Sequence, residues 1–352
     1  MKKILLTGAS GYIGSHLMNK LKENYEIIAV SRNIENKSNE QNVTWKSADL
    51  FDLNEITEVM KNVDIAIYLV HSMMPSARLT QASFEDMDAI LADNFAKASS
   101  FNKVKHIVFM SGLIPNTNEL SPHLRSRLEC ERILGAYGVP VTTLRAGLII
   151  GAKGSSYPIL KKLVERLPGL LLPKWAYNTT LPVAIDDVIN GLYKIVERDP
   201  QENESIDIGG PSHMTYKDLF NQTAQVLDKS LPTLDLPIIP IWLSKYWVKL
   251  ISGVPKEMVY PLMDSLIHDM IRDNKNIVED ISIGKIDYKE SVRNALEEEA
   301  VTQKKSKKAS KSAIKDVRAI SRVTLPKDMT MSQLAELYAN FLNKITLNVV
   351  SS

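Results

Sequence analysis

The sequence predicts an α/β protein, in which a doubly wound parallel sheet is followed by a small, mostly helical C-terminal region. Three observations predict it. A short apolar run at 4–7 leads into three regularly spaced glycines, and an amphipathic helical pattern follows. Apolar strand-like runs then alternate with helical patterns to about residue 145, the order that gives a parallel sheet. The chain has 352 residues, 44% of them hydrophobic, which is enough for a sizeable core.

The expected elements follow in order along the chain. The strands are predicted at Ile4–Thr7, Glu26–Val30, Val43–Lys46, Asp64–Val70, His106–Met110 and Val139–Leu144. The helices between them are predicted at Tyr12–Lys22, Leu53–Asn62, Phe84–Phe101 and Pro122–Tyr137. The last of these has a clear start, because Ser121 can cap a helix that carries proline in its first turn.

The pattern continues beyond residue 147 with longer loops. Residues 181–184 read as an extended entry into a helix, and we expect Asp186 and Asp187 to cap that helix. A strand at Ser205–Ile208 and a helix at Tyr216–Leu227 complete this part of the chain.

The first glycines have the spacing that a dinucleotide pyrophosphate needs between a strand and a helix. Gly8 permits the tight turn, Gly11 lets the backbone approach the phosphates, and Gly14 lets the helix pack on the strand. The helix N-terminus adds free N–H groups and a partial positive charge. The stretch therefore predicts a dinucleotide site formed by Gly8, Ser10, Gly11, Tyr12, Ile13 and Gly14.

Composition excludes several classes of function. A net charge of +2 argues against a dedicated nucleic-acid binder. A single cysteine, Cys130, excludes an internal disulfide framework, and the six histidines lack the spacing of metal ligands, so we predict no metal site. Met1-Lys2-Lys3 leads directly into the first strand, and no apolar run reaches the roughly 18 residues that span a bilayer. We therefore expect a cytoplasmic protein.

The chain is expected to divide into four parts. Residues 1–230 would form the dinucleotide-binding domain with part of a substrate region, and 231–300 a helical segment rich in aromatic residues. In that segment Trp242, Tyr246 and Trp247 recur near helical spacing, which favours a subdomain covering its own core over a helix that contacts a membrane or covers an apolar substrate. The lysine-rich residues 301–313 are expected to be a linker, and 314–352 a tail that could begin a further domain.

Several motifs carry a resemblance. Residues 7–14, Asp49-Leu50 after the third strand and Val183–Val188 resemble the short-chain dehydrogenase/reductase superfamily over roughly residues 1–230, in its atypical or extended branch. Residues 68–73 and 121–127 are similar to an NAD(P)-binding bacterial subgroup of epimerase-like and NmrA-like proteins. The resemblance implies a Rossmann-type fold, an NAD(P) cofactor and a partly helical substrate region. It also places Asp49 and Leu50 near the adenine.

The end of the second strand bears on the choice of cofactor. An acidic residue usually holds the ribose of NAD(H) there, but the strand ends in Ser31-Arg32. The guanidinium fork of Arg32 suits a phosphate, which favours NADP(H) over NAD(H). Leu69, Val70, His71 and Ser72 end the fourth strand, where a doubly wound sheet binds ligands. We therefore expect Leu69, Val70 and His71 to bind the cofactor, with His71 and Ser72 near the nicotinamide. The alternative is that these are loop residues without a catalytic part.

The resemblance implies a catalytic serine after the fifth strand and a Tyr-x-x-x-Lys pair on the next helix. Ser111 matches the serine, whereas the pair is absent from the helix expected to carry it. His123 and Arg127, four residues apart on one helix face, occupy the only plausible register. Arginine could hold the ribose, and histidine titrates close enough to neutrality to transfer a proton. Ser111, His123 and Arg127 are the catalytic candidates, with a surface-capping pair as the alternative for the last two.

Two functions remain open. One is an NADP(H)-dependent oxidoreductase, or an epimerase-like enzyme, acting on a small carbonyl or hydroxyl compound. The other is a non-catalytic dinucleotide-binding sensor or accessory protein that assists an assembly. The complete glycine loop is compatible with both, and the missing tyrosine favours the second.

Overall fold

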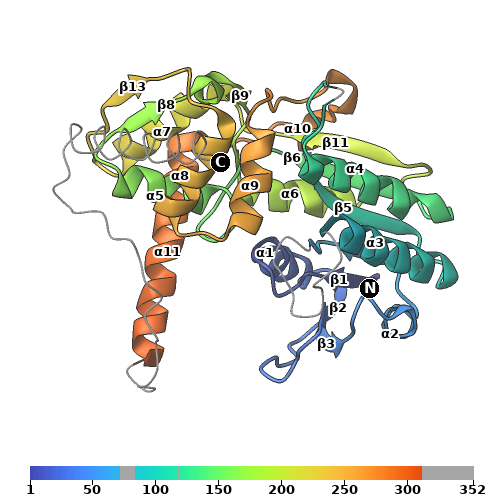
Figure 1. The fold of residues 1–352 in the computed structure, drawn as a ribbon. Coiled ribbons are helices and arrows are strands. Elements are labelled where there is room, and N and C mark those ends of the chain that lie inside the picture. The colour runs from blue at the N-terminus through green and yellow to red at the C-terminus, as the bar shows by residue number, and fades with distance from the viewer. Residues whose placement is uncertain (72–83, 118, 311–352) are drawn as a thin grey trace, which may run out of the picture.

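A seven-stranded parallel sheet forms the centre of the protein (Figure 1). The computed structural model describes residues 1–71, 84–117 and 119–310. The strands are β1 (Lys3–Thr7), β2 (Glu26–Ser31), β3 (Val43–Ser47), β4 (Ile65–Tyr68), β5 (His106–Gly112), β6 (Val141–Ala146) and β11 (Glu204–Ile208). Their order in the sheet is β11-β6-β5-β4-β1-β2-β3. Because the order reverses between β1 and β4, the crevice in which such sheets bind ligands lies at the carboxyl ends of these two strands.

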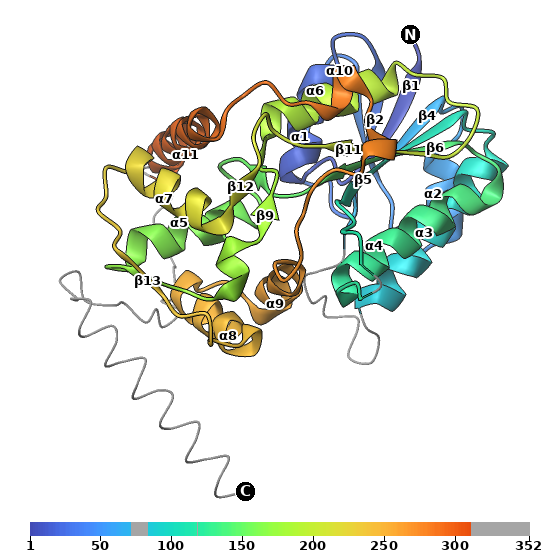
Figure 2. The same cartoon turned by 90° about the horizontal axis from the view of Figure 1, so that it is seen from above.

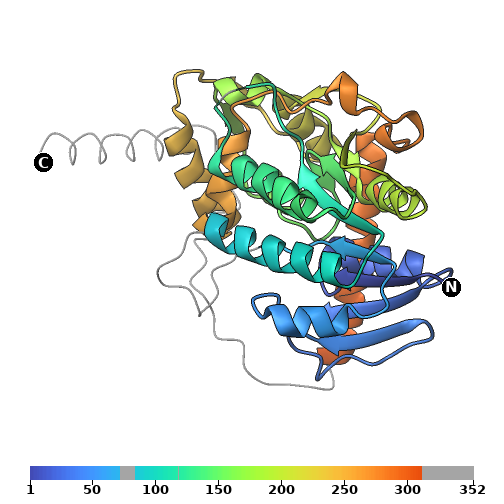
Figure 3. The same ribbon diagram turned by 90° about the vertical axis from the view of Figure 1, so that its right-hand side faces the viewer.

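Helices cover both faces of the sheet (Figures 2 and 3). One face carries α1 (Tyr12–Leu21) and α6 (Ile185–Val196), and the other carries α2 (Leu53–Val59), α3 (Phe84–Phe101) and α4 (Pro122–Leu134). Successive side chains of β1 point to opposite faces of the sheet. Ile4 and Leu6 are buried on the α1/α6 face and Leu5 on the opposite face, as the period of two in a strand requires. The predicted doubly wound α/β fold is confirmed.

The C-terminal region has a core of its own and is mostly helical, as predicted. Its helices are α5 (Tyr157–Arg166), α7 (Tyr216–Val226), α8 (Ile241–Ser252), α9 (Lys256–Ser265), α10 (Glu279–Ser282) and α11 (Tyr288–Ser310). Pairs of short strands connect them: β7 (Ile149–Ile150) with β10 (Val183–Ala184), β9 (Thr179–Thr180) with β12 (Met214–Thr215), and β8 (Leu170–Leu172) with β13 (Thr233–Asp235).

The prediction of a linker at 301–313 is wrong for its first part, because α11 continues to Ser310. Lysine, glutamate and alanine favour helix, and the buried side chains of Val292 and Ala295 anchor α11 in the C-terminal core. The remaining linker residues and the predicted tail, 314–352, lie outside the described residues.

The capping role predicted for Asp186 and Asp187 is also wrong. Ala184 is the N-cap residue of α6, and no side chain caps this helix. Asp187 is buried instead, and its Oδ2 accepts hydrogen bonds from the backbone N–H groups of Lys285 at 3.0 Å and Ile286 at 3.1 Å. The carboxylate thus ties α6 to the segment that precedes α11.

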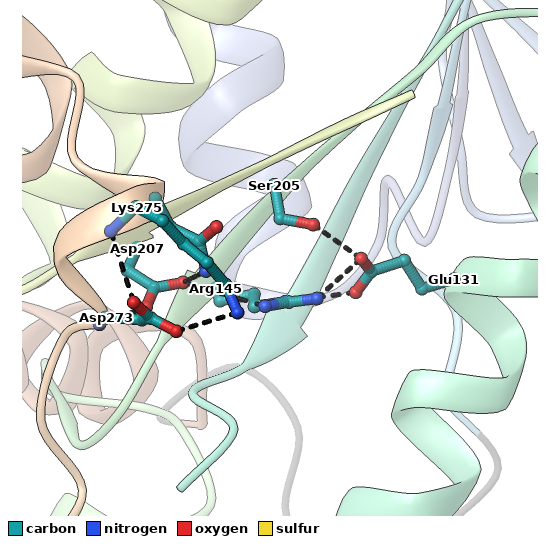
Figure 4. A network of polar contacts seen from close by, with 7 residues as sticks. Glu131, Arg145, Ser205, Asp207, Asp273 and Lys275 are labelled. Carbon is teal, nitrogen blue, oxygen red and sulfur yellow. Dashed lines mark hydrogen bonds and ion pairs between the residues drawn. The ribbon is translucent and has the colours of Figure 1, made fainter. Parts of the chain in front are cut away.

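A polar network joins the sheet edge to the connection before α10 (Figure 4). Arg145 on β6 donates to both carboxylate oxygens of Glu131 on α4, at 2.7 and 3.1 Å. Asp207 on β11 accepts from the backbone N–H of Asp273 at 2.8 Å and from the side chain of Asn276 at 3.2 Å. Burial raises the pKa of Asp207 despite these contacts. The network fixes residues 273–276 against the Rossmann sheet.

The aromatic segment is divided between core and surface. In α8, Leu243 and Val248 are buried and Trp247 packs against the C-terminal core, whereas Trp242 and Tyr246 are exposed. The subdomain does cover its own core, but two of its aromatic side chains remain outside it. No helix in the described ranges combines the length and apolar character needed to cross a membrane.

Candidate functional site

The glycine turn between β1 and α1 has no room for side chains. Gly8 has a φ of +70°, and a Cβ there would lie 2.8 Å from the carbonyl oxygen of Leu69. A Cβ on Gly14 would lie 2.2 Å from the carbonyl oxygen of Gly8, so α1 can approach β1 only because Gly14 has none. The turn closes through a hydrogen bond of 2.8 Å from the Gly11 N–H to the Gly8 carbonyl. The backbone is therefore shaped into a cradle at the N-terminus of α1.

This cradle opens into a groove across the carboxyl ends of β1, β2 and β4. Most of the residues predicted to bind cofactor line the groove, namely Gly8, Ser10, Gly11, Arg32, Asp49, Leu50, Leu69, Val70 and His71. Tyr12, Ile13 and Gly14 do not line it, because they form the first turn of α1. Ser72 and Met73, which complete the motif after β4, lie outside the described residues.

The groove fits a dinucleotide. Its inner end offers glycine backbone and the free N–H groups of a helix N-terminus, which suit a pyrophosphate. Its outer end carries the exposed Arg32, whose guanidinium makes no ion pair with any described residue. Between them, the Asp49 N–H donates to Glu55 at 2.8 Å and the Asp49 carboxylate accepts from the Phe51 N–H at 3.1 Å, which fixes the loop expected at the adenine.

The side chain of Tyr12 engages the C-terminal region. Its hydroxyl donates to Glu298 of α11 at 2.6 Å and accepts from the Ala152 N–H at 3.0 Å. Burial, followed by the hydrogen bond to Glu298, raises the pKa of Tyr12 well above its ordinary value. Tyr12 thus connects the glycine turn to α11. Only its backbone N–H, and not its side chain, is left to bind the phosphates of a dinucleotide.

The groove ends at a cluster of buried polar side chains beyond β4 and β5. His71, which follows β4, has its Nδ1 2.7 Å from Oδ2 of Asp88 on α3. The ring of His123, in the first turn of α4, lies 5.0 Å from that of His71 between centroids. Ser111, near the end of β5, has a buried Oγ without a hydrogen-bond partner among the described residues. The structure therefore brings His71 and His123 together and adds Asp88, and it places Ser111 on the neighbouring strand β5.

Arg127 lies beneath this cluster. Its guanidinium donates to the carbonyl oxygens of Met110 and Val70, the latter at 3.5 Å, and its Cζ is 4.6 Å from the ring centroid of Phe109. Only 5% of the residue is exposed. The side chain holds the ends of β4 and β5 together, so these donors are engaged with backbone rather than with a ribose.

The two histidines differ in their electrostatic surroundings. Burial, together with the charges of His71 and Arg127, lowers the pKa of His123 to about 3. Burial and Arg127 also lower the pKa of His71, but its hydrogen bond with Asp88 acts in the opposite direction. Both rings are neutral near pH 7, and His71 is the one whose cation has a carboxylate beside it.

An apolar cavity begins where the groove ends. Gly112, His123 and Gly147 lie at the sheet side of the cavity, and the C-terminal region supplies its other walls. The described side chains that line it are predominantly apolar, and none of these carries a full charge at neutral pH. The larger ones are Leu124, Leu148, Leu160, Trp175, Tyr216, Phe220 and Met263.

Asp88 is the functional candidate that sequence reasoning missed, although a signal for it exists. In the helix Phe84–Phe101, Leu91, Ala92 and Phe95 follow Asp88 at helical spacing, and all four are buried. A carboxylate within an apolar helix stripe is unusual enough to mark a site. No group of three potential metal-binding side chains occurs within the described part of the chain.

The Tyr-x-x-x-Lys spacing occurs at another place, Tyr157 and Lys161 on α5. Tyr157 is buried in the C-terminal core, and Lys161 pairs with Glu165 at 3.1 Å and Glu299 at 2.5 Å. Neither residue lines the groove or the apolar cavity. This pair is therefore structural, and α4 provides no tyrosine to replace it.

Comparison with known proteins agrees with the motifs. Residues 8–166 match a family model described as NAD(P)H-binding. Auxiliary protein GraX of Staphylococcus aureus is 35% identical over 144 residues, 40% of this chain and 43% of GraX. The match thus spans less than half of that relative. UDP-glucose 4-epimerase of Vibrio cholerae is 22% identical over 276 residues, 71% of this chain and 82% of the epimerase.

Solved structures share the fold. The Escherichia coli NADPH-dependent quinone oxidoreductase, complexed with NADPH, superposes with a TM-score of 0.65 at 20% identity, covering 83% of this chain and 99% of the other. The Citrobacter triphenylmethane reductase, complexed with NADP(H), gives 0.65 at 17% identity, covering 84% and 100%. Residues 8–166 therefore match an NAD(P)H-binding domain, and the chain shares its fold with a quinone oxidoreductase and a triphenylmethane reductase, the Rossmann-type fold that its motifs predict.

Proposed function

We propose that the protein is an NADP(H)-dependent oxidoreductase that reduces a small, largely apolar carbonyl compound. One observation supports this most strongly: the dinucleotide groove and the apolar cavity meet at a pair of histidines. His71 lines the groove, His123 lines the cavity, and their ring centroids are 5.0 Å apart. A nicotinamide at the end of the groove would face a substrate in the cavity, which is the arrangement that hydride transfer requires.

The cavity lining favours reduction over sugar-nucleotide epimerisation. A nucleoside diphosphate sugar needs cationic and hydrogen-bonding partners, whereas no lysine or arginine among the described residues lines this cavity. Leu160, Trp175 and Phe220 suit a flat apolar compound instead. Two structural neighbours are named for a quinone and for triphenylmethane compounds, which also contain flat conjugated rings.

Arg32 supports the preference for NADP(H). It is exposed at the end of β2, it lines the groove, and no carboxylate takes its place there. A 2′-phosphate on the adenosine ribose would lie within the reach of a guanidinium at this strand end. An NAD(H)-specific site would instead need an acceptor for the ribose hydroxyls.

The chain's own groups would orient and polarise the substrate. When bound, the nicotinamide supplies or accepts a hydride. The Ser111 hydroxyl, buried and without a partner in the described part, can donate a hydrogen bond to the substrate oxygen. Arg127 holds the strand ends that carry Ser111 and His71, and the apolar cavity walls exclude water from the reacting centre.

A second candidate is a non-catalytic dinucleotide-binding protein that assists another assembly. It is favoured by the 35% identity with an auxiliary protein and by the absence of a tyrosine on α4. In that case the groove would bind the cofactor, and no substrate would be converted in the apolar cavity.

The test is NADPH oxidation, followed by absorbance, with a panel of quinones, aromatic aldehydes and aromatic ketones. We expect turnover of at least one compound, and Ser111→Ala to lower kcat by about tenfold or more. Arg32→Ala should raise the Kd for NADPH about tenfold and leave that for NADH unchanged. Lys37→Ala is the matched control, because Lys37 follows Arg32 in the same exposed loop and does not line the groove.

Two results would count against the proposal. NADPH binding without oxidation by any compound would favour the auxiliary role. An unchanged NADPH-to-NADH affinity ratio in Arg32→Ala would exclude Arg32 as the residue that selects the phosphate.

A further inference from the structure

We propose that His71, oriented by Asp88, donates the proton to the substrate oxygen and so takes the place of the missing tyrosine. This inference rests on the proposed reductase function and identifies the residue that acts as its general acid. It also assigns a role to Asp88, a positioning residue that does not touch the substrate.

The contact between the two side chains defines the direction of the imidazole. Asp88 is 1% exposed, and its Oδ2 is 2.7 Å from Nδ1 of His71. Since an ionised carboxylate only accepts, Nδ1 carries the hydrogen and donates it. Nε2 is then the nitrogen left for chemistry, and it is buried without a hydrogen-bond partner among the described residues. A carboxylate behind a histidine fixes its tautomer and stabilises the imidazolium.

The position of Nε2 suits proton transfer at the end of the groove. His71 follows β4, beside the Leu69 and Val70 backbone that lines the groove, and its ring neighbours that of His123, which lines the cavity. A substrate oxygen at this junction would lie within reach of Nε2 of His71, and the hydroxyl of Ser111, on the neighbouring strand β5, is the second donor that we propose for it. Serine would donate a hydrogen bond and histidine would donate the proton.

Asp88 is difficult to explain as a purely structural residue. It occupies an apolar stripe of α3 with Leu91 and Phe95, and a buried carboxylate is unfavourable unless hydrogen bonds or a cation compensate for its lost hydration. Its placement against a histidine that lines the groove is the arrangement expected of a tuned acid or base.

His123 is not suited to be the acid. Its Nδ1 is buried without a partner, and no described carboxylate lies in hydrogen-bond or ion-pair contact with it. The protonated ring would be a cation beside the Arg127 cation, with no described carboxylate in contact to offset the repulsion. His71 faces the same cation but has Asp88. The titratable and charged groups around His71 are Tyr68 on β4, Asp88 on α3, and His123, Arg127 and Cys130 on α4.

The proposed step balances. The carbonyl carbon gains a hydride from NADPH, which becomes NADP⁺, and the carbon–oxygen π bond breaks. The resulting alkoxide oxygen takes the proton from Nε2 of imidazolium His71. The product is the alcohol, and neutral His71 regains a proton from water before the next turnover.

The pH dependence follows from the same groups. Burial and Arg127 lower the pKa of His71, so its acid form becomes more abundant as pH falls. The reduction rate should therefore rise from pH 8 toward pH 5.5. Asp88→Asn removes the compensating charge, so the rising limb should move to lower pH.

The experiment compares full-length wild type with His71→Asn, Asp88→Asn and Asp88→Glu in the NADPH oxidation assay. We expect His71→Asn to lower kcat about 100-fold or more, and Asp88→Asn about tenfold, with partial rescue by Asp88→Glu. The Kd for NADPH, measured by fluorescence, separates a loss of chemistry from a loss of binding. His106→Asn is the control, because His106 is a buried histidine at the other end of β5, bonded to Thr142 at 2.9 Å.

The outcomes separate the two proposals. If wild type binds NADPH but oxidises it with no compound, the reductase function fails, and the role of His71 with it. If wild type turns over and His71→Asn retains its kcat, only the role of His71 is overturned. An Asp88→Asn profile that is lower at every pH but unshifted would show that Asp88 acts on folding rather than on His71.

Discussion

The absence of a Cβ atom at Gly8 and Gly14 allows the conformation of the glycine turn. Gly8 adopts a backbone conformation that side chains disfavour, and Gly14 faces the Gly8 carbonyl at a distance that excludes a Cβ. The two positions therefore combine a turn requirement with a packing requirement. Both arise from the need to bring the N-terminus of α1 close to the end of β1.

Gly14→Ala tests this packing requirement. The added Cβ would lie 2.2 Å from the Gly8 carbonyl oxygen, so the helix must shift away from the strand. We expect the free energy of unfolding to fall by about 1–3 kcal/mol and the Kd for NADPH to rise about tenfold or more. Urea denaturation and fluorescence titration measure these changes. Gly154→Ala is the control, because its Cβ would meet nothing within 4 Å; equal effects of the two substitutions would refute the packing role.

At the scale of elements, buried side-chain contacts connect the Rossmann sheet to the C-terminal region. Asp187 joins α6 to the segment before α11, and Tyr12 joins α1 to Glu298 of α11. These bonds hold α11 and the segment before it against α1 and α6. On the other face of the sheet, α9 packs against α4 and Ser265 lies 3.1 Å from Ser121, so the C-terminal region is attached on both sides.

Adjacent aspartates provide a matched test of this attachment. Asp187→Ala leaves the Lys285 and Ile286 N–H groups without their acceptor, whereas Asp186 is exposed and accepts none of these bonds. We expect Asp187→Ala to lower the free energy of unfolding by about 1–3 kcal/mol and Asp186→Ala to change it by less than about 0.5 kcal/mol. The comparison is made by urea denaturation. A larger effect from Asp186→Ala would mean that the helix terminus, rather than the tie to 285–286, carries the stability.

The sequence predicts helices and strands well where the hydrophobic periodicity and the length of a segment indicate the same kind of element. The long strands and the helices of 1–146 lie within a few residues of their predicted bounds, because each has a continuous apolar run or stripe. Strands of two or three residues, such as β7 and β10, have no period to detect. Asp186 and Asp187 show a further limit, since local sequence cannot reveal acceptors required by a segment almost 100 residues away.

The part of the candidate site that depends on local sequence could also be predicted. The glycine turn, Arg32 and His71 are local features of strand ends, so sequence alone places them at one edge of the sheet. The contact between His71 and Asp88 depends on how α3 packs, and the backbone bonds of Arg127 depend on the register of β4 and β5. Spacing along the chain does not contain this information.

For the whole molecule, buried neutral histidines make stability depend on pH. Burial lowers the pKa of His106 to about 4 from an unfolded value of 6.5. Between these values the unfolded state binds more protons than the native state, so stability falls as pH falls. His123, with a pKa of about 3, adds to the same trend.

We expect His106 to reduce the free energy of unfolding by about 3 kcal/mol between pH 7 and pH 4. Urea denaturation of wild type and His106→Asn at both pH values isolates its contribution from that of the carboxylates. The variant should lose less stability than wild type on acidification. A constant difference between the two proteins would show that His106 does not titrate in this way.

The most direct measurement is a crystal structure with bound NADP⁺. We predict a pyrophosphate at the N-terminus of α1, a 2′-phosphate against Arg32, and a nicotinamide whose C4 faces the apolar cavity with Ser111 and Nε2 of His71 beside it. A nicotinamide turned away from the cavity, or a cofactor bound outside the groove, would contradict the proposed reductase.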